Sequence, residues 1–399
     1  MRIERGIRRF LKGLGLVLLF ASCAAPLSLN VDEGKKLRLL FVGDIMAHKE
    51  QLESARKAGG EWDFSPQFRR VKPLFGSKAK LKERSVLVTG NLETVFAGKK
   101  RGFAGYPSFN TPDALADALA DLGVDVLTLA NNHILDRGPS GAKRTTEVLD
   151  RAGILWTGIS AGPMEKTEKD ETGGVLTAES AGMRVAFVNY SYGSNRPPKS
   201  GDVSLNTISD TAVTDGLARA RLSSPDIVVA CFHWGNEYQS APTKRQRALA
   251  ALAAGEGADL VIGTHPHVLQ PVEVLVSGGK SAVGVTAYSL GNFISYQRTP
   301  PRERSVILAV DAEKNAGDSK ARVTRVSVAP IWVSARRADG KRRIEAVYAG
   351  ESTRFNHAGL PAAELAAARA AGKAVLEFLG AAASADAEGF YTLWDERDI

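Results

Sequence analysis

The sequence repeatedly places a short apolar run directly before a cluster of polar residues that can bind ligands or move protons. Apolar runs of about four to eight residues that end at turn residues are typical of buried strands. In α/β folds, ligand-binding groups gather where the strands end, because rigid strands hold those side chains at one rim of a sheet. Six such runs are expected here: 37–42 before Gly43-Asp44, 86–89 before Gly90-Asn91-Leu92-Glu93, 124–130 before Asn131-Asn132-His133, 227–232 before His233-Trp234-Gly235-Asn236-Glu237, 260–262 before Gly263-Thr264-His265-Pro266-His267, and 285–290 before Gly291-Asn292.

Helical segments are expected between these strands. Thr111-Pro112-Asp113 predicts a helix start, with Thr111 as the N-cap, and that helix ends near Gly123. Residues 141–152 and 242–254 have a similar pattern, and the chain after residue 298 predicts three more strands and an Ala-rich helix over 362–379. The expected organisation is a signal peptide over 1–22, a linker over 23–36, a main domain over 37–297 and a C-terminal β/α extension over 298–399.

The composition is that of a soluble globular protein, with 44% hydrophobic and 24% charged residues among 399. Half of the formal net charge of +8 lies in the first twelve residues. The remaining chain has no dense Lys/Arg tract, so a nucleic-acid partner is not expected.

The N-terminus reads as a targeting segment: a basic stretch, an apolar run over 14–20 and then small residues before Cys23. That run is about half the length a membrane-spanning helix needs, so a permanent transmembrane helix is the weaker interpretation. Phe20-Ala21-Ser22-Cys23 resembles a bacterial lipobox, with Phe20 in place of the usual leucine. We therefore expect an exported protein, lipid-anchored to the cell envelope through Cys23 and, in a Gram-negative cell, to the outer membrane. The alternative is ordinary cleavage near Ala24 or Ala25, which would release a soluble protein.

Only one other cysteine is present, Cys231, and it lies within an apolar strand-like run. A chain with Cys23 lipidated has no partner left for a disulfide. We therefore expect Cys231 to be a buried, unreactive thiol.

The histidines are concentrated at the strand ends, where five of the six lie in or beside the polar clusters. Histidine, carboxylate and amide ligands together suit Zn, Mn or Fe better than Ca or Mg, which favour oxygen ligands alone. Pro266 is expected to hold its segment extended, so that His265 and His267 leave the chain on the same side. Each cluster also has a purely structural interpretation as a turn. The candidate metal ligands are Asp44, Glu93, Asn132, His233, His265 and His267.

The ordered series of motifs resembles the CapA family of poly-γ-glutamate capsule biosynthesis proteins. The residues that carry this resemblance lie between about 37 and 295, close to two thirds of the chain: Gly43-Asp44, Asn91-Leu92-Glu93, Asn131-Asn132-His133-Ile134-Leu135-Asp136, His233-Trp234-Gly235, Gly263-Thr264-His265-Pro266-His267-Val268 and Ser289-Leu290-Gly291-Asn292-Phe293. The resemblance implies the calcineurin-like metallophosphoesterase fold, with two facing mixed β-sheets flanked by helices and two metal ions at the rim.

The resemblance also implies roles for the candidate residues. Asp44 and His267 would bind one metal ion, Glu93 would bridge the two ions, and Asn132, His233 and His265 would bind the second. His133 would protonate the leaving group. The superfamily usually has a histidine two residues after the first aspartate, where this chain has Met46, and His48 is a candidate substitute.

From these residues we hypothesise metal-assisted hydrolysis, in which water attacks a phosphorus or acyl carbon while His133 donates a proton to the departing atom. Asp136 either orients His133 or caps the following helix. The resemblance points to an anionic polymer such as poly-γ-glutamate, or its synthase complex, as the partner. Two alternatives remain: a non-catalytic surface lipoprotein that binds polymer or synthase, and an envelope phosphodiesterase or phosphatase.

Overall fold

A computed structural model of the chain describes residues 34–76, 85–161, 174–196, 203–277, 281–338, 340–352, 354–355 and 357–398. Cys23, with the predicted signal peptide, lies outside these residues. The helices within the described ranges are all too short or too polar to cross a membrane.

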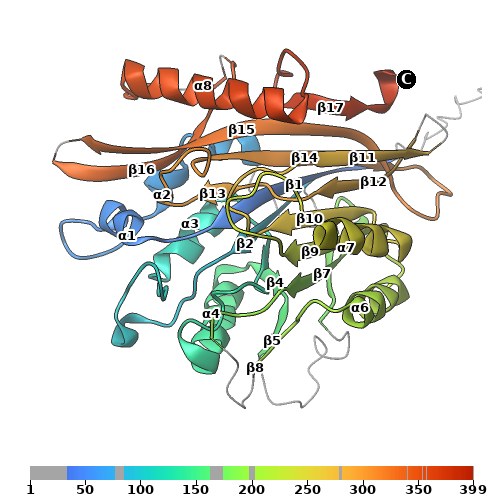
Figure 1. Ribbon diagram of the computed structural model, residues 1–399, viewed down its shortest axis with the longest axis horizontal. Coiled ribbons are helices and arrows are strands. Elements are labelled where there is room, and N and C mark those ends of the chain that lie inside the picture. Colours follow the sequence, from blue (N-terminus) through green and yellow to red (C-terminus); the bar gives the residue numbers. More distant parts are fainter. Residues whose placement is uncertain are drawn as a thin grey trace, which may run out of the picture. The chain divides into compact units, whose positions relative to one another are not determined.

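One long sheet dominates the fold, and each of its two halves contains a series of parallel strands (Figure 1). The predicted strand runs all appear in it. The first half contains β1 (Lys35–Ile45), β2 (Val86–Leu92), β3 (Val126–Thr128) and β4 (Leu155–Thr157). The second contains β7 (Met183–Ser191), β9 (Ile227–His233), β10 (Leu260–Thr264) and β12 (Ser281–Ala287), with β6 (Leu176–Ser180) antiparallel at its edge.

The two halves are joined by β14 (Arg304–Lys314) and β15 (Arg322–Ala338). Strand β14 pairs antiparallel with β1 from Lys35 to Phe41, and β15 pairs with both β14 and β12. The sequence predicted a separate C-terminal extension after residue 298. The structure shows instead that β14 and β15 of this segment connect the two halves of the sheet. Strand β14 pairs with residues more than 250 positions earlier in the chain, which local patterning cannot reveal.

Shorter strands extend this arrangement. They are β11 (Val272–Ser277) on β12, β13 (Asn292–Ile294) on β1, β16 (Lys341–Tyr348) and β17 (Tyr391–Asp395) on β15, and the separate pair β5 (Ile159–Ala161) and β8 (Val203–Leu205).

The two halves face each other, since β1 lies against β10 and β4 lies against β6 and β7. Residues of β1 and alternate residues of β9, such as Phe41 and Val229, belong to one buried cluster. Burial of each such side chain stabilises the fold by about 1.5–3 kcal/mol. Cys231 is buried in the same cluster, and burial raises the pKa of its thiol to about 12, which agrees with the predicted unreactive cysteine. The α/β fold class with mixed sheets flanked by helices is confirmed.

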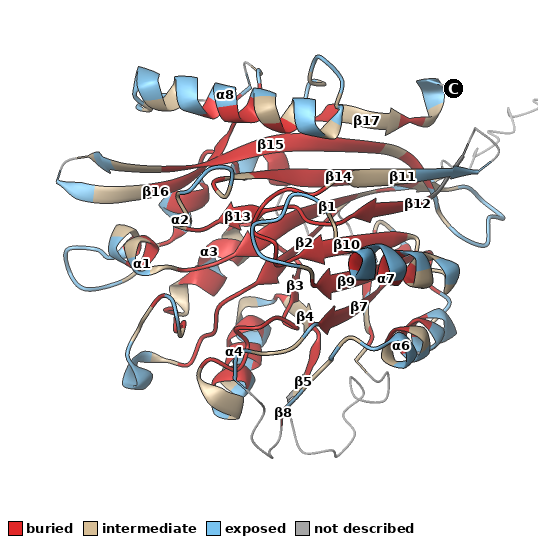
Figure 2. Ribbon diagram, in the orientation of Figure 1, coloured by how far each residue is buried: buried red, intermediate tan, exposed pale blue. Residues whose placement is uncertain are grey.

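Helices cover the outer faces of the sheet, and their outward sides are exposed (Figure 2). Helices α6 (Asp210–Leu222) and α7 (Lys244–Gly255) bury Leu217 and Leu249 against the second half. Helix α8 (Ala362–Leu379) covers β15. The first half packs against α3 (Ala114–Leu122) and α4 (Gly138–Ala152), and the short elements are α1 (Lys49–Ala55), α2 (Ser65–Phe68), η1 (Lys72–Phe75), η3 (Lys99–Arg101) and η4 (Glu396–Asp398).

The predicted helices are present, with one difference at an N-terminus. Asp113, not Thr111, is the N-cap of α3. The Thr111 hydroxyl instead lies 2.7 Å from the Thr94 hydroxyl and ties the loop before α3 to the segment that follows β2.

Candidate metal centre

The polar clusters predicted from the sequence meet at one edge of the sheet, where the parallel strands of both halves end. Asp44 ends β1, Glu93 follows β2 and His233 ends β9. The remaining predicted residues follow β3 and β10. The structure brings together Asp44, Glu93, Asn132, His133, Asp136, His233, His265 and His267, and all eight are buried.

The Glu93 carboxylate belongs to two overlapping sets of possible metal ligands. One set is Glu93 with His233 and His265, and the other is Glu93 with Asp44 and His267. Within each set the candidate ligand atoms lie within 4.8 Å of one another. Glu93 is the residue that these two sets share.

Asp44 is positioned by a close approach of β1 to the turn before β13. A Cβ atom on Gly43 would lie 1.8 Å from the carbonyl oxygen of Gly291, so a residue with a side chain would push the two segments apart. The Asp44 backbone N–H donates to that same oxygen at 3.0 Å. One oxygen of the Asp44 carboxylate accepts a 2.8 Å hydrogen bond from Asn91, and the other lies 3.0 Å from Nδ1 of His267.

His233 is held by residues from three strand ends. Its Nε2 lies 2.9 Å from Oδ1 of Asn132 and 3.8 Å from Oε1 of Glu93, and its Nδ1 lies 3.1 Å from the Thr264 hydroxyl. Burial, followed by the nearby His265 and His267, lowers the pKa of His233 well below its usual value. The ring is therefore neutral, the form that binds a cation.

His265 and His267 converge in a way that differs from the predicted extended segment. Their φ angles are +97° and +58°, in the left-handed region that residues with side chains seldom adopt. The Pro266 carbonyl accepts a 2.7 Å hydrogen bond from the Tyr238 N–H, which helps to hold this turn. Such backbone strain is found mainly at functional sites, where the surrounding structure enforces it.

Two buried atoms at this site have no hydrogen-bond partner among the described residues: Oε1 of Glu93 and Nδ1 of His265. Burial and the adjacent Asp44 carboxylate raise the pKa of Glu93 well above its usual value, while burial lowers the pKa of His265 to about 4. An unpartnered carboxylate oxygen beside neutral imidazoles is costly unless a cation completes it. The residues present therefore fit divalent cations.

His133 and Asp136 form a connected pair beside these ligands. Nδ1 of His133 lies 2.8 Å from Oδ2 of Asp136, which also accepts a 2.7 Å hydrogen bond from the Phe109 N–H. The Phe109 ring lies edge-on to the imidazole, with the centroids 4.7 Å apart. Asp136 thus contacts the His133 ring directly.

Met46 and His48, which follow Asp44 in the sequence, do not join the ligand set of Asp44, Glu93 and His267. Met46 is buried, and Nδ1 of His48 accepts a 3.2 Å hydrogen bond from the Tyr296 N–H. Neither residue belongs to a metal-ligand set of the described residues.

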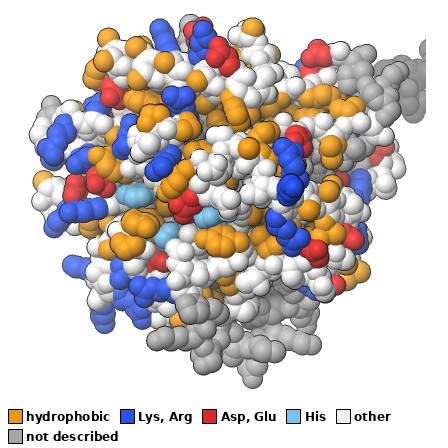
Figure 3. Space-filling view, viewed as in Figure 1, with side chains coloured by type: hydrophobic (Ala, Val, Ile, Leu, Met, Phe, Trp, Pro, Cys, Tyr) orange, Lys and Arg blue, Asp and Glu red, His pale blue; other side chains and the backbone are white. Residues whose placement is uncertain are grey.

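Sequence reasoning missed two residues that the structure places in the centre. Asn91 donates to Asp44, and its Nδ2 also lies 3.4 Å from both Glu93 and His233. It precedes Glu93 by two positions, and that strand spacing could have revealed it. The exposed Glu237 forms a third ligand set with His265 and His267, but its loop carries no periodic signal. Figure 3 shows histidine side chains close to acidic ones on the face of the molecule in view.

Comparison with known proteins places this chain beside capsule synthesis proteins. Residues 38–297 match the family model described as "bacterial capsule synthesis protein". The chain is 31% identical over 270 residues to the capsule biosynthesis protein CapA of Bacillus anthracis, an alignment that covers 66% of this chain and 60% of that protein. It is 29% identical over 296 residues to the PGA biosynthesis protein CapA of Bacillus subtilis, covering 72% of this chain and 70% of that protein. Among solved structures, a 5'-nucleotidase from Candida albicans aligns at 10% identity with a TM-score of 0.42, over 74% of this chain and 52% of the other.

Proposed function

We propose that this chain, which belongs to the bacterial capsule synthesis protein family, acts in the synthesis of an anionic capsule polymer of the poly-γ-glutamate class. We further propose that the rim is a hydrolytic or group-transfer centre with two divalent cations, Mn, Zn or Fe. The observation that carries this proposal is the Glu93 carboxylate shared by two ligand sets.

The residues divide into two groups. One cation would be held by Asp44 and His267. The other would be held by Asn132, His233 and His265, and Glu93 would contact both cations. When bound, the cations would polarise the substrate and lower the pKa of a bound water. Asn91 keeps the Asp44 carboxylate oriented through its 2.8 Å hydrogen bond.

His133 is the residue proposed to move a proton. Asp136 accepts a hydrogen bond from a protonated Nδ1, which leaves Nε2 as the ring atom that faces the substrate side. The Asn195 side-chain nitrogen lies 3.5 Å from Nε2. A proton donated from His133 would neutralise the departing oxygen or nitrogen as its bond to phosphorus or acyl carbon breaks.

A two-substrate assay tests this function. Metal-replete protein is incubated with poly-γ-glutamate and, separately, with a generic phosphodiester, before and after chelation. The proposal expects chelator-sensitive cleavage or transfer on the glutamate polymer. Activity on the phosphodiester alone would point to the envelope phosphodiesterase, and binding of polymer with no turnover on either substrate would point to the non-catalytic surface protein.

The location of the protein is part of the proposal. The sequence of the first 23 residues supports export and a lipid on Cys23, which would place the centre where an exported polymer passes. Mass spectrometry of the membrane fraction should find a thioether-linked lipid on an N-terminal Cys23. Recovery of only a soluble form that begins at Ala24 or later would contradict it.

A further inference from the structure

Three arginines surround a cavity of about 450 Å³ beside the His133–Asp136 pair. They come from three separate segments: Arg101 ends η3, Arg137 precedes α4 and Arg196 follows β7. Asp136 and the first turn of α4 complete the lining. The fold therefore brings three positive charges together from positions far apart in the sequence.

The three guanidinium groups are held by uncharged partners. Arg101 donates to the carbonyl of Arg137 at 2.6 Å and to the Ser140 hydroxyl at 2.7 Å. Arg137 donates to the carbonyls of Ser108 and Phe109, and Arg196 donates to the Ser108 hydroxyl at 3.3 Å. Within the described ranges, none of these three side chains forms an ion pair with a carboxylate.

Other arginines near this region are paired. Arg144, about two helical turns after Arg137 in α4, makes two 2.7 Å hydrogen bonds to the Asp113 carboxylate. At the cavity, by contrast, burial lowers the pKa of Arg137, and the nearby charges of Arg196 and Arg101 act in the same direction against the Asp136 carboxylate. Three arginines and a single carboxylate, that of Asp136, give the cavity lining a net positive charge, which favours binding of an anion.

The residues that lie against the two nitrogens of the His133 ring each directly precede an arginine of this cavity. Arg137 directly follows Asp136, which contacts Nδ1 of His133. Arg196 directly follows Asn195, whose side-chain nitrogen lies 3.5 Å from Nε2. An anion in the cavity would therefore lie next to the proposed proton donor. Figure 3 shows Lys and Arg side chains gathered on the same face as the histidines.

We propose that Arg101, Arg137 and Arg196 form a carboxylate-binding subsite that holds a side-chain carboxylate of a polyanionic substrate next to His133. The planar guanidinium fork matches a carboxylate through paired hydrogen bonds. The α4 N-terminus adds a favourable dipole at the cavity wall. The identity of the polymer rests on the proposed function, whereas the anion subsite follows from the arginines themselves.

Equilibrium binding tests this subsite without requiring turnover. Binding of a defined γ-linked glutamate oligomer to the full chain is measured by calorimetry for the wild type and for Arg101→Gln/Arg137→Gln/Arg196→Gln. Loss of several charge-assisted hydrogen bonds should weaken binding by about tenfold to a hundredfold. The Lys triple variant at the same positions keeps the charge and should recover part of the affinity.

A matched control removes the same amount of charge elsewhere. Lys57, Arg245 and Lys373 are exposed, and their Gln triple variant should bind the oligomer like the wild type. Arg196→Gln alone removes only one side-chain hydrogen bond, so it keeps the test valid if the triple variant folds poorly.

The outcomes separate this inference from the proposed function. Arginine-dependent binding without turnover would support the subsite and contradict the hydrolytic role. Turnover with unchanged oligomer affinity and KM in the arginine variants would support the centre and overturn the subsite. Equal weakening by the control triple variant would also overturn it, because general charge alone would then explain the binding.

Discussion

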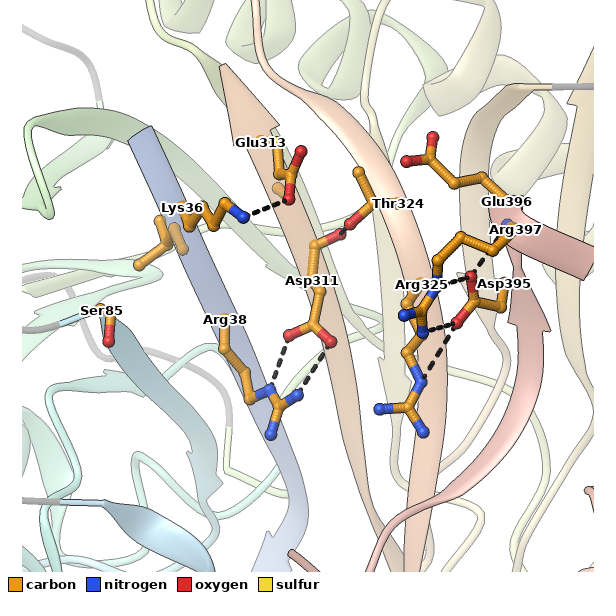
Figure 4. A pocket seen from close by; sticks show the side chains of 12 residues that line it. Lys36, Arg38, Ser85, Asp311, Glu313, Thr324, Arg325, Asp395, Glu396 and Arg397 are labelled. Atoms are coloured by element: carbon orange, nitrogen blue, oxygen red, sulfur yellow. Dashed lines mark hydrogen bonds and ion pairs between the residues drawn. The ribbon is translucent and has the colours of Figure 1, made fainter. Parts of the chain in front are cut away.

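Strand β1 leads from one charged region to another, and the two regions differ in whether their charges have partners. Near its start, Lys36 and Arg38 line a pocket of about 530 Å³ with residues of β14, β15 and β17 (Figure 4). At its end, Asp44 lies in the metal centre. The distance between Arg38 and Asp44 along the strand is about 20 Å.

The pocket at the start of β1 neutralises its own charges. Arg38 donates to both oxygens of Asp311, at 2.6 and 2.9 Å, and Lys36 lies 3.3 Å from Glu313. Asp395 accepts from Arg397 (Figure 4). The first two pairs join β1 to β14, the third lies within the C-terminal segment, and the pocket lining holds as many acidic as basic side chains.

The rim is the opposite case. Among the described residues, Oε1 of Glu93 and Nδ1 of His265 have no hydrogen-bond partner, and the three arginines beside His133 share their cavity with a single carboxylate, that of Asp136. A fold tolerates such groups when a ligand completes them. Ion pairs across strands stabilise the sheet at the first region, whereas at the rim the Glu93 and His265 atoms without hydrogen-bond partners belong to sets of possible metal ligands.

The largest expected effect separates the proton donor from the metal ligands. His133→Ala should retain its metal and fold but lose hydrolysis by about 10²–10⁴-fold, the usual contribution of a general acid. Steady-state rates and metal content are measured on the same sample. A variant with full activity would remove His133 from the mechanism.

A smaller effect is expected from single metal ligands. His265→Ala and His267→Ala should each weaken metal affinity by about tenfold or more, because each removes one ligand atom from its set. Competition with a chelator of known affinity measures the change. Unchanged affinity in both variants would show that the rim holds no metal.

The smallest effect is expected at the paired pocket. Asp311→Asn should lower the free energy of unfolding by about 1 to 2 kcal/mol, because it weakens the two hydrogen bonds from Arg38 and leaves that guanidinium less well neutralised. Urea unfolding gives this value. Metal affinity should stay at the wild-type level, and a change in it would break the distinction between the two regions.

The sequence allowed the rim to be predicted because parallel strands end at a common edge, so polar residues that follow buried runs must meet there. Asp44, Glu93 and His233 each carry that local signal. The turn of His265 and His267 was predicted incorrectly as extended. Pro266 restricts its own φ, but the positive φ angles on either side depend on contacts from distant segments, such as the Tyr238 N–H.

The connection between the two sheet halves could not be predicted. An apolar run such as 305–310 predicts a strand but does not say which strand it pairs with, and β14 pairs with β1 across most of the chain length. The arginine cavity is missed for the same reason, because Arg101, Arg137 and Arg196 become neighbours only in the folded chain.

Metal stoichiometry of the wild type and of Glu93→Gln shows whether the Glu93 carboxylate is shared by two cations. Gln has the shape of a protonated glutamate, the form favoured by the raised pKa of Glu93 in the metal-free centre, so this variant should fold normally. After loading with Mn or Zn and removal of free metal, plasma emission should find about two ions per wild-type chain and fewer than one in Glu93→Gln, with Asp311→Asn matching the wild type. A wild type that binds no metal, or a Glu93→Gln variant that keeps both ions, would contradict the proposal that two cations share the Glu93 carboxylate.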